Sequence, residues 1–149
     1  MPHFEFTSWI DAPLEKVWAF HEREDVLRLL APPGTEVVSR KGGLETGARV
    51  EFRAPVLGPL KVRWLALHVD HERLRFFVDE QIRGPFQRWR HEHRFAEENG
   101  GTRLTDAIEY SLPLAPVSHW LAGWAVKLQL RTMFANRHRT TKEYCERPG

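Results

Sequence analysis

The sequence predicts an α+β domain in which a curved antiparallel sheet of six to seven strands wraps around one long C-terminal helix. Three observations support this fold class. Much of the chain after residue 34 alternates apolar and polar residues with a period of two, which is typical of half-buried strands. Residues 117–144 contain no proline and repeat apolar residues at helical spacing, which predicts a long helix. An antiparallel sheet with one apolar face needs a cover, and only this helix is long enough to supply it.

Size and composition favour one soluble domain, residues 1–149. The 42% hydrophobic and 28% charged residues are ordinary for a globular protein, and no apolar run approaches the roughly 20 residues of a membrane span. The single cysteine, Cys145, cannot form an internal disulfide, and the N-terminus has no signal-peptide core, so we expect a cytoplasmic protein. The formal net charge of +2 is too small to indicate a nucleic-acid partner.

The first part of the chain predicts one strand followed by two short helices. Residues 3–11 alternate as a strand, and Ala12-Pro13 begins a helix, because proline is favoured in a first helical turn. Leucine and valine residues between positions 26 and 30 predict a second short helix, which ends at Ala31-Pro32-Pro33-Gly34.

The remaining strands lie between residues 35 and 112. Alternation is clear over residues 48–54 and least regular over residues 60–70, where both faces are covered or a bulge changes the parity. Glycine-containing segments between the strands predict the turns. These turns are expected at Lys41-Gly42-Gly43, between Pro55 and Pro59 through Gly58, at Gly84-Pro85, and at Glu97 to Gly101.

The strand over residues 88–95 gives the main indication of function. Trp89, His91, His93 and Phe95 share one parity, whereas the opposite parity is entirely charged. The charged face belongs in water, so the aromatic and imidazole face is expected to point inwards. A packing core would favour Val, Ile or Leu at these positions, and the two inward histidines therefore indicate a site.

The turn at Asn99-Gly100 sets the pairing of this strand with residues 102–112. The expected register places His93 opposite Asp106 and Trp89 opposite Tyr110, at the short distance of directly opposed side chains. An inward carboxylate therefore faces an inward imidazole. A shift of one residue would move a whole face to the other side of the sheet.

The preceding strand, residues 74–83, is expected to contribute a second acid. Pairing across Gly84-Pro85 places Glu80 near His91, with Phe76 on the same face. The expected constellation on the concave side of the sheet is then Glu80, His91, His93 and Asp106.

A curved sheet that grips one helix leaves a cavity between them, and rigid aromatic side chains can line it. From the helix, Trp124 and Leu128 belong to a broad apolar stripe. The far side of the helix is basic; a solvated face is the simplest interpretation, and a membrane-surface role is the alternative. The expected ligand-binding residues are Trp64, Phe76, Glu80, Trp89, His91, His93, Phe95, Asp106, Tyr110, Trp124 and Leu128.

Four interpretations of the inward histidines remain open. They can form a structural network, with His93 bonded to Asp106 and His91 to Glu80. They can orient the polar end of a ligand. They can act in catalysis, with the His93–Asp106 pair as general base. Two histidines and two carboxylates can also bind Zn²⁺ or Fe²⁺, but histidines two apart on a strand are a non-specific spacing, so we expect no metal and no cofactor.

Two motifs carry a resemblance to a known family. The chain opens on I-D-A-P-x-x-x-V-W at residues 10–18, and the hairpin reads G-P-F-x-x-W-x-H-x-H-x-F from Gly84, then G-G-T-x-x-x-D-x-x-x-Y-x-L-P from Gly100. Together with the element order, they resemble the START/Bet v1-like (SRPBCC) superfamily, which has a helix-grip fold. The match is closest to its polyketide cyclase/dehydrase and lipid-transport-like branch. The hairpin motifs are similar to a subgroup that also occurs fused to NAD-dependent epimerase-like domains.

The resemblance implies binding or transport of a small hydrophobic or amphipathic molecule in the cavity. Two alternatives stay open, because one fold hosts many functions. One is a cyclase- or dehydratase-type enzyme that uses the histidine–aspartate pair. The other is an accessory module with a filled pocket that works through partner contacts. Since this sequence contains no epimerase domain, an epimerase-like partner would act in trans.

Overall fold

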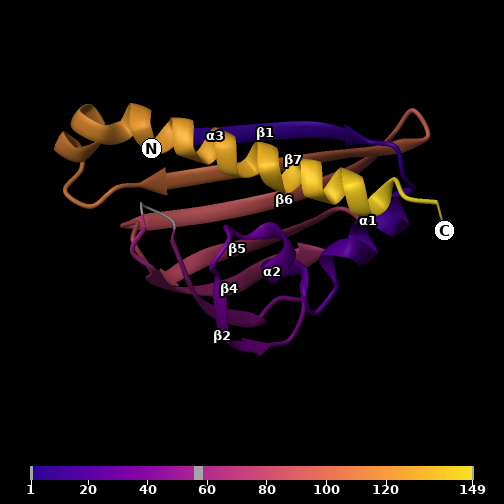
Figure 1. Ribbon diagram of the computed structural model, residues 1–149, viewed down its shortest axis with the longest axis horizontal. Coiled ribbons are helices and arrows are strands. Elements are labelled where there is room, and N and C mark those ends of the chain that lie inside the picture. The colour runs from indigo at the N-terminus through magenta and orange to yellow at the C-terminus, as the bar shows by residue number, and fades with distance from the viewer. Residues whose placement is uncertain (1, 56–58, 149) are drawn as a thin grey trace.

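The computed structural model describes residues 2–55 and 59–148 as one curved antiparallel sheet with three helices (Figure 1). In order, the elements are β1 His3–Ile10, α1 Leu14–His21, α2 Val26–Leu30, β2 Glu36–Lys41, β3 Arg49–Ala54, β4 Val62–Glu72, β5 Phe76–Arg83, β6 Arg88–Glu98, β7 Gly101–Ser111 and α3 Val117–Cys145. The strands pair in the order β1-β7-β6-β5-β4-β3-β2. The predicted fold class is confirmed, while the predicted turn through Gly58 lies outside the described residues.

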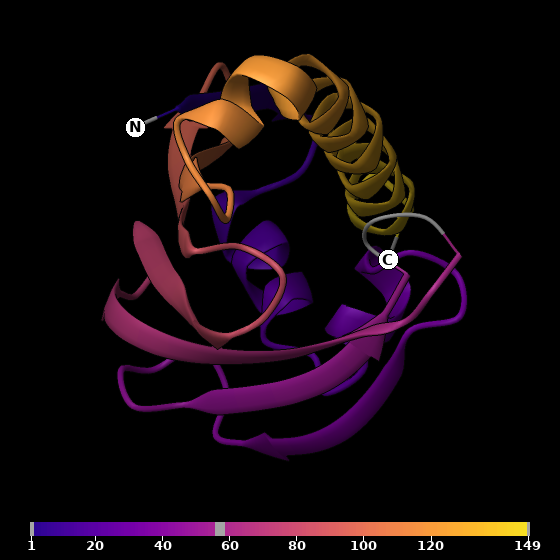
Figure 2. The same ribbon diagram turned by 90° about the vertical axis from the view of Figure 1, so that its left-hand side faces the viewer.

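The concave side of the sheet holds all three helices. Figure 2 shows the strands curving around a space that α3, α1 and α2 close. Helix α3 runs along β1, and both short helices contact it. None of the helices described over residues 2–55 and 59–148 is long and apolar enough to cross a membrane.

Two hydrophobic clusters fill the interior, and the histidines of β6 lie where they meet. One cluster joins α3 to the middle of the sheet and includes Phe134, and the other joins α1 to the far end of the sheet and includes Phe77. His91 packs edge-on against Phe134, with 5.2 Å between ring centroids. His93 stacks on Phe77 at 3.9 Å. The apolar packing therefore fixes the positions of both imidazoles.

The β6–β7 hairpin has the predicted register. Asn99 and Gly100 both have positive φ values, 50° and 76°, which suits a tight two-residue hairpin turn. His93 pairs with Asp106 and Trp89 with Tyr110, as the sequence predicted. Both histidines therefore face the interior.

The predicted parity of β5 is wrong by one residue. Asp79 pairs with His91, and Glu80 pairs with Arg90, so Phe76 and Glu80 point to the outer face. Glu80 forms an ion pair with Arg90 at 3.0 Å there. The connection after β5 is not a tight turn, because the side chain of Gln81 bonds both backbone groups of Phe86 and shapes a longer loop.

The predicted apolar stripe of α3 is also largely wrong. Trp120 and Trp124 are 83% and 72% exposed, and Leu128 is 59% exposed. The sheet instead covers a different face of the helix, because the first turns of α3 extend past the end of β7 (Figure 1). The buried residues are spaced three or four apart on that face. They are Val126, Leu130, Phe134, His138, Thr141 and Cys145.

Candidate functional site

A cavity of about 160 Å³ lies between the concave face of the sheet, α2 and the second half of α3. Its wall is divided by chemistry. The apolar part includes Phe52, Trp64, Ala66, Trp89, Met133 and Phe134. The polar part consists of His21, Glu24, Arg40, Arg49, His68, Asp79, His91, His93 and Arg137. The cavity is therefore mainly apolar, with imidazoles, carboxylates and guanidinium groups along part of its surface.

The predicted site residues fall into three groups. Trp64, Trp89, His91 and His93 line the cavity. The next group is buried in the protein without forming the cavity surface, and it consists of Phe95, Asp106 and Tyr110. The last group faces away from the cavity, and for it the prediction was wrong. It consists of Phe76 and Glu80 on the outer face of β5, and Trp124 and Leu128 on the exposed face of α3.

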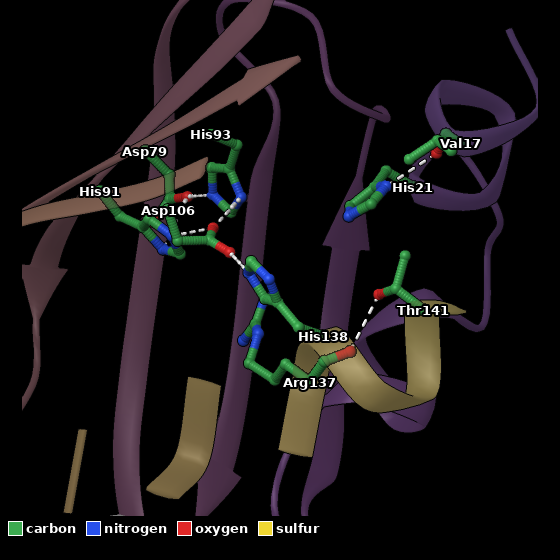
Figure 3. Close-up of polar contacts among 9 residues, drawn as sticks. All are labelled: Val17, His21, Asp79, His91, His93, Asp106, Arg137, His138 and Thr141. Carbon is green, nitrogen blue, oxygen red and sulfur yellow. Dashed lines mark hydrogen bonds and ion pairs between the residues drawn. The ribbon is translucent and has the colours of Figure 1, made fainter. Parts of the chain in front are cut away.

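Asp106 is the centre of a buried polar network (Figure 3). Its carboxylate accepts hydrogen bonds from His91 Nε2 at 2.6 Å and from His138 Nε2 at 2.5 Å. His93 Nδ1 lies 3.2 Å from the same carboxylate. His138 Nδ1 in turn bonds Ser8 Oγ at 2.8 Å. The network therefore links β1, β6, β7 and α3.

Asp79 is the second carboxylate, in the place where Glu80 was expected. His93 Nε2 lies 2.8 Å from Asp79 Oδ2, and His91 Nδ1 lies 3.9 Å from the same atom. One signal in the sequence points to this parity, because Glu80 opposite Arg90 makes a favourable cross-strand charge pair on a solvated face. The expected bond between His91 and Glu80 does not form, since Asp106 takes that position.

The two carboxylates are held ionised, although Asp106 is buried and Asp79 is half-buried. Burial alone would raise the pKa of each. For Asp106, hydrogen bonds from His138, His91 and His93 hold the pKa well below its usual range. For Asp79, the hydrogen bond from His93 and the nearby His91 lower the pKa to about 2. Both groups can therefore act as acceptors near neutral pH.

The two histidines of β6 differ in the direction in which their pKa values are shifted. Burial lowers the pKa of His91 to about 4, and the neighbouring His93 contributes to that decrease. Burial would also lower the pKa of His93, but its bonds to Asp106 and Asp79 raise it above the usual value. His93 is therefore the imidazole of the pair that favours the positive charge.

Three further cavity residues were not predicted as site residues. His21 Nδ1 bonds the carbonyl oxygen of Val17 at 2.8 Å, and burial lowers its pKa to about 4. His68 is buried, its Nδ1 bonds the carbonyl oxygen of Leu44 at 3.1 Å, and it also lines the cavity. Arg137 places its guanidinium 5.1 Å from the centroid of the Phe134 ring.

Comparisons with known proteins agree with this architecture. Residues 10–136 match the model of the family described as Polyketide cyclase / dehydrase and lipid transport. The solved structure of TTHA0849 from Thermus thermophilus is 26% identical, with a TM-score of 0.76 and 95% of each chain covered. A START superfamily protein from Mycobacterium smegmatis has the same fold, at 12% identity, a TM-score of 0.71 and 97% of each chain covered. A search of curated proteins finds no match.

One similar structure is a longer protein. It is a nucleoside-diphosphate sugar epimerase from Corynebacterium glutamicum, 27% identical with a TM-score of 0.70. The match covers 94% of this chain but only 28% of that one. The similarity is therefore limited to one part of that protein.

Proposed function

Because the chain belongs to the polyketide cyclase/dehydrase and lipid transport family, whose START/Bet v1-like fold it has, we propose that it binds or carries a small apolar molecule with one polar end. The observation that carries this proposal is the divided wall of the cavity. Aromatic side chains such as Trp64 and Trp89 favour an apolar body, while Asp79, His91 and Arg137 offer partners for polar atoms.

The volume limits the size of the ligand. The cavity of about 160 Å³ compares with an engineered cavity of roughly 150 Å³ that takes up benzene. A compound of one or two aromatic rings fits this size, and a longer ligand would extend towards the exposed rim near Glu24 and Val37. A hydroxyl group can donate to Asp79, and a carbonyl oxygen can accept from Arg137.

The two alternatives from the sequence find less support. As a catalytic base, His93 would need a free ring nitrogen, but both of its nitrogens lie within 3.2 Å of a carboxylate oxygen. An accessory module with a filled pocket does not require a cavity of this volume. The match to part of a longer epimerase supports an epimerase-like partner in trans as a proposal that is independent of the ligand.

Calorimetric titration with 2-naphthol tests the proposal, since this compound joins two apolar rings to one hydroxyl group. We expect saturable binding of one molecule per chain. Ala66→Phe fills the cavity from β4 and should weaken that binding at least tenfold, because Ala66 is buried in the wall. Ala96→Phe is the matched control, since it adds the same ring to an exposed position of β6 and should bind like the wild type.

Naphthalene supplies the second comparison. If the polar wall holds the hydroxyl group, naphthalene should bind more weakly than 2-naphthol to the wild type. Equal binding of 2-naphthol by the wild type and Ala66→Phe would place the ligand outside the cavity and refute the proposal. So would the absence of any binding, combined with a native mass spectrum that shows no co-purified molecule.

A further inference from the structure

We propose that Asp79, His91 and His93 form a binding site for a divalent transition-metal ion, best suited to Zn²⁺, with one coordination position open to the cavity. These residues come from the neighbouring strands β5 and β6 and share the concave face. One possible ligand atom from each lies within 4.8 Å of the others. The sequence alone indicated no metal, because the spacing of two histidines on one strand is unspecific. The structure adds Asp79 as the third ligand.

The distances fit a tetrahedral ion. In such a site with bonds of about 2.0–2.1 Å, ligand atoms lie about 3.3 Å from one another. The observed separations from Asp79 Oδ2 are 2.8 Å to His93 Nε2 and 3.9 Å to His91 Nδ1, on either side of that value. Small side-chain movements would therefore place all three atoms around one ion.

Asp106 can accept the ring hydrogens of both imidazoles on the side away from the proposed metal ion. A carboxylate only accepts, so His91 Nε2, which faces Asp106 at 2.6 Å, carries its hydrogen. His93 has a carboxylate on each side, with Nε2 2.8 Å from Asp79 and Nδ1 3.2 Å from Asp106, so a metal ion on Nε2 would leave the ring hydrogen on Nδ1, towards Asp106. In a neutral imidazole the other nitrogen then has a free lone pair. Those nitrogens are His91 Nδ1 and His93 Nε2, and both face Asp79. A carboxylate behind each metal-binding histidine is the usual support of such sites.

The contact between His93 and Asp79 is the place where a metal ion would bind. With its hydrogen on the Asp106 side, His93 Nε2 and Asp79 Oδ2 would be two acceptors only 2.8 Å apart. A proton on Nε2 or a metal ion resolves this contact, and a proton there must leave when a metal ion binds. One proton would leave the carboxylates of Asp79 and Asp106 with a single positive charge, whereas a divalent ion balances both.

Two of the arginines that line the cavity, Arg40 and Arg137, make their contacts away from the two carboxylates. Arg137 lies over the Phe134 ring, and the guanidinium of Arg40 donates to the carbonyl oxygens of Arg23, Glu24 and Gly42. Neither forms an ion pair with Asp79 or Asp106 among the described residues. Since all three proposed ligands line the cavity, the remaining coordination position faces it. Three protein ligands with one open position are typical of zinc sites that bind a water molecule or substrate.

The test is a calorimetric titration of chelator-treated protein with ZnCl₂, without any organic ligand, so its outcome is independent of 2-naphthol binding. We expect one tight site in the wild type. Asp79→Asn should weaken it at least tenfold, because the amide replaces an anionic ligand. Glu80→Gln is the matched control, since it makes the same change one residue along β5 on the outer face, and it should bind zinc like the wild type.

Nuclear magnetic resonance of the wild type with ¹⁵N-labelled histidine gives a result that does not depend on the folding of a variant. Zinc should shift the signals of His91 Nδ1 and His93 Nε2 and leave His3 and His119 unchanged. The proposal is overturned if zinc does not bind. It is equally overturned if zinc binds with the same affinity to Asp79→Asn, or if it shifts only surface histidines. Those results would leave a protonated histidine network in place of the metal.

Discussion

Asp106 shows how one residue can organise a polar site inside an apolar core. It is buried, and three imidazoles from β6 and α3 approach its carboxylate. Since a carboxylate has about four acceptor positions, one residue can satisfy all three. Each histidine is thereby fixed in orientation, so the position of Asp106 determines the shape of the cavity wall.

Replacing this residue should therefore be costly. In Asp106→Asn, the amide nitrogen would face an imidazole N–H, so two donors meet and a buried hydrogen bond is lost. We expect the free energy of unfolding in urea to fall by about 3–5 kcal/mol, as for a buried ion pair that loses one partner. Glu109→Gln, on the exposed face of the same strand, should change it by less than about 0.5 kcal/mol. Equal stabilities of the two variants would contradict the central role of Asp106.

At the scale of the elements, the two hairpins around β6 show what the sequence can predict. The β6–β7 register follows from a two-residue Asn99-Gly100 turn, whose geometry is determined locally. The β5–β6 register depends on Gln81, whose side chain bonds the backbone of Phe86 inside the loop. That contact arises only in the folded chain, so the turn itself could not identify Asp79 as the inward acid, and the charge pair of Glu80 with Arg90 was the remaining signal in the sequence.

Helix α3 shows a second limit of prediction from the sequence, because it has apolar residues on more than one face. Which of these faces the sheet covers depends on where the sheet ends, and the spacing of apolar residues along the helix gives no information about that. His138 was missed for a related reason, since it lies between Arg137 and Arg139 in a segment that is typical of a solvated face. Its spacing of four from Phe134 and eight from Leu130 is the local signal that could have revealed it.

The two faces of α3 should respond differently to the same change. Phe134→Ala removes a buried ring and should lower the free energy of unfolding by about 3–5 kcal/mol. Trp124→Ala removes a larger but exposed ring, and we expect a change within about 0.5 kcal/mol. Urea denaturation of both variants measures the difference. A large loss in Trp124→Ala would show that this face is covered in solution.

For the whole molecule, the interior contains an unusual number of groups that can change charge. His21, His68, His91, His93 and His138 are all buried, together with Asp106. A neutral buried histidine resists protonation in the folded state, whereas the unfolded chain accepts the proton readily. The stability of the fold is therefore expected to depend on pH in the acidic range.

His21 gives a defined test of that dependence. Its pKa falls from 6.5 to about 4 on folding, so between these values the unfolded chain binds a proton that the folded chain excludes. The stabilisation is complete above pH 6.5 and is lost as the pH falls to about 4, by up to roughly 3 kcal/mol. Asn at position 21 can still donate to Val17 but does not titrate. Urea midpoints measured over this range should therefore fall less in His21→Asn than in the wild type, and parallel curves would contradict the assignment.

The bond between His138 and Ser8 joins residues that are 130 positions apart in the sequence. Helix α3 follows all seven strands, so during synthesis the part of the concave face that this helix covers stays open until the ribosome has released it. Until then Asp106 lacks its partner from α3, and water can reach the aromatic residues of the cavity wall. The growing chain therefore gains its final core in one late step, and before that step it offers an apolar surface to chaperones and to other unfinished chains.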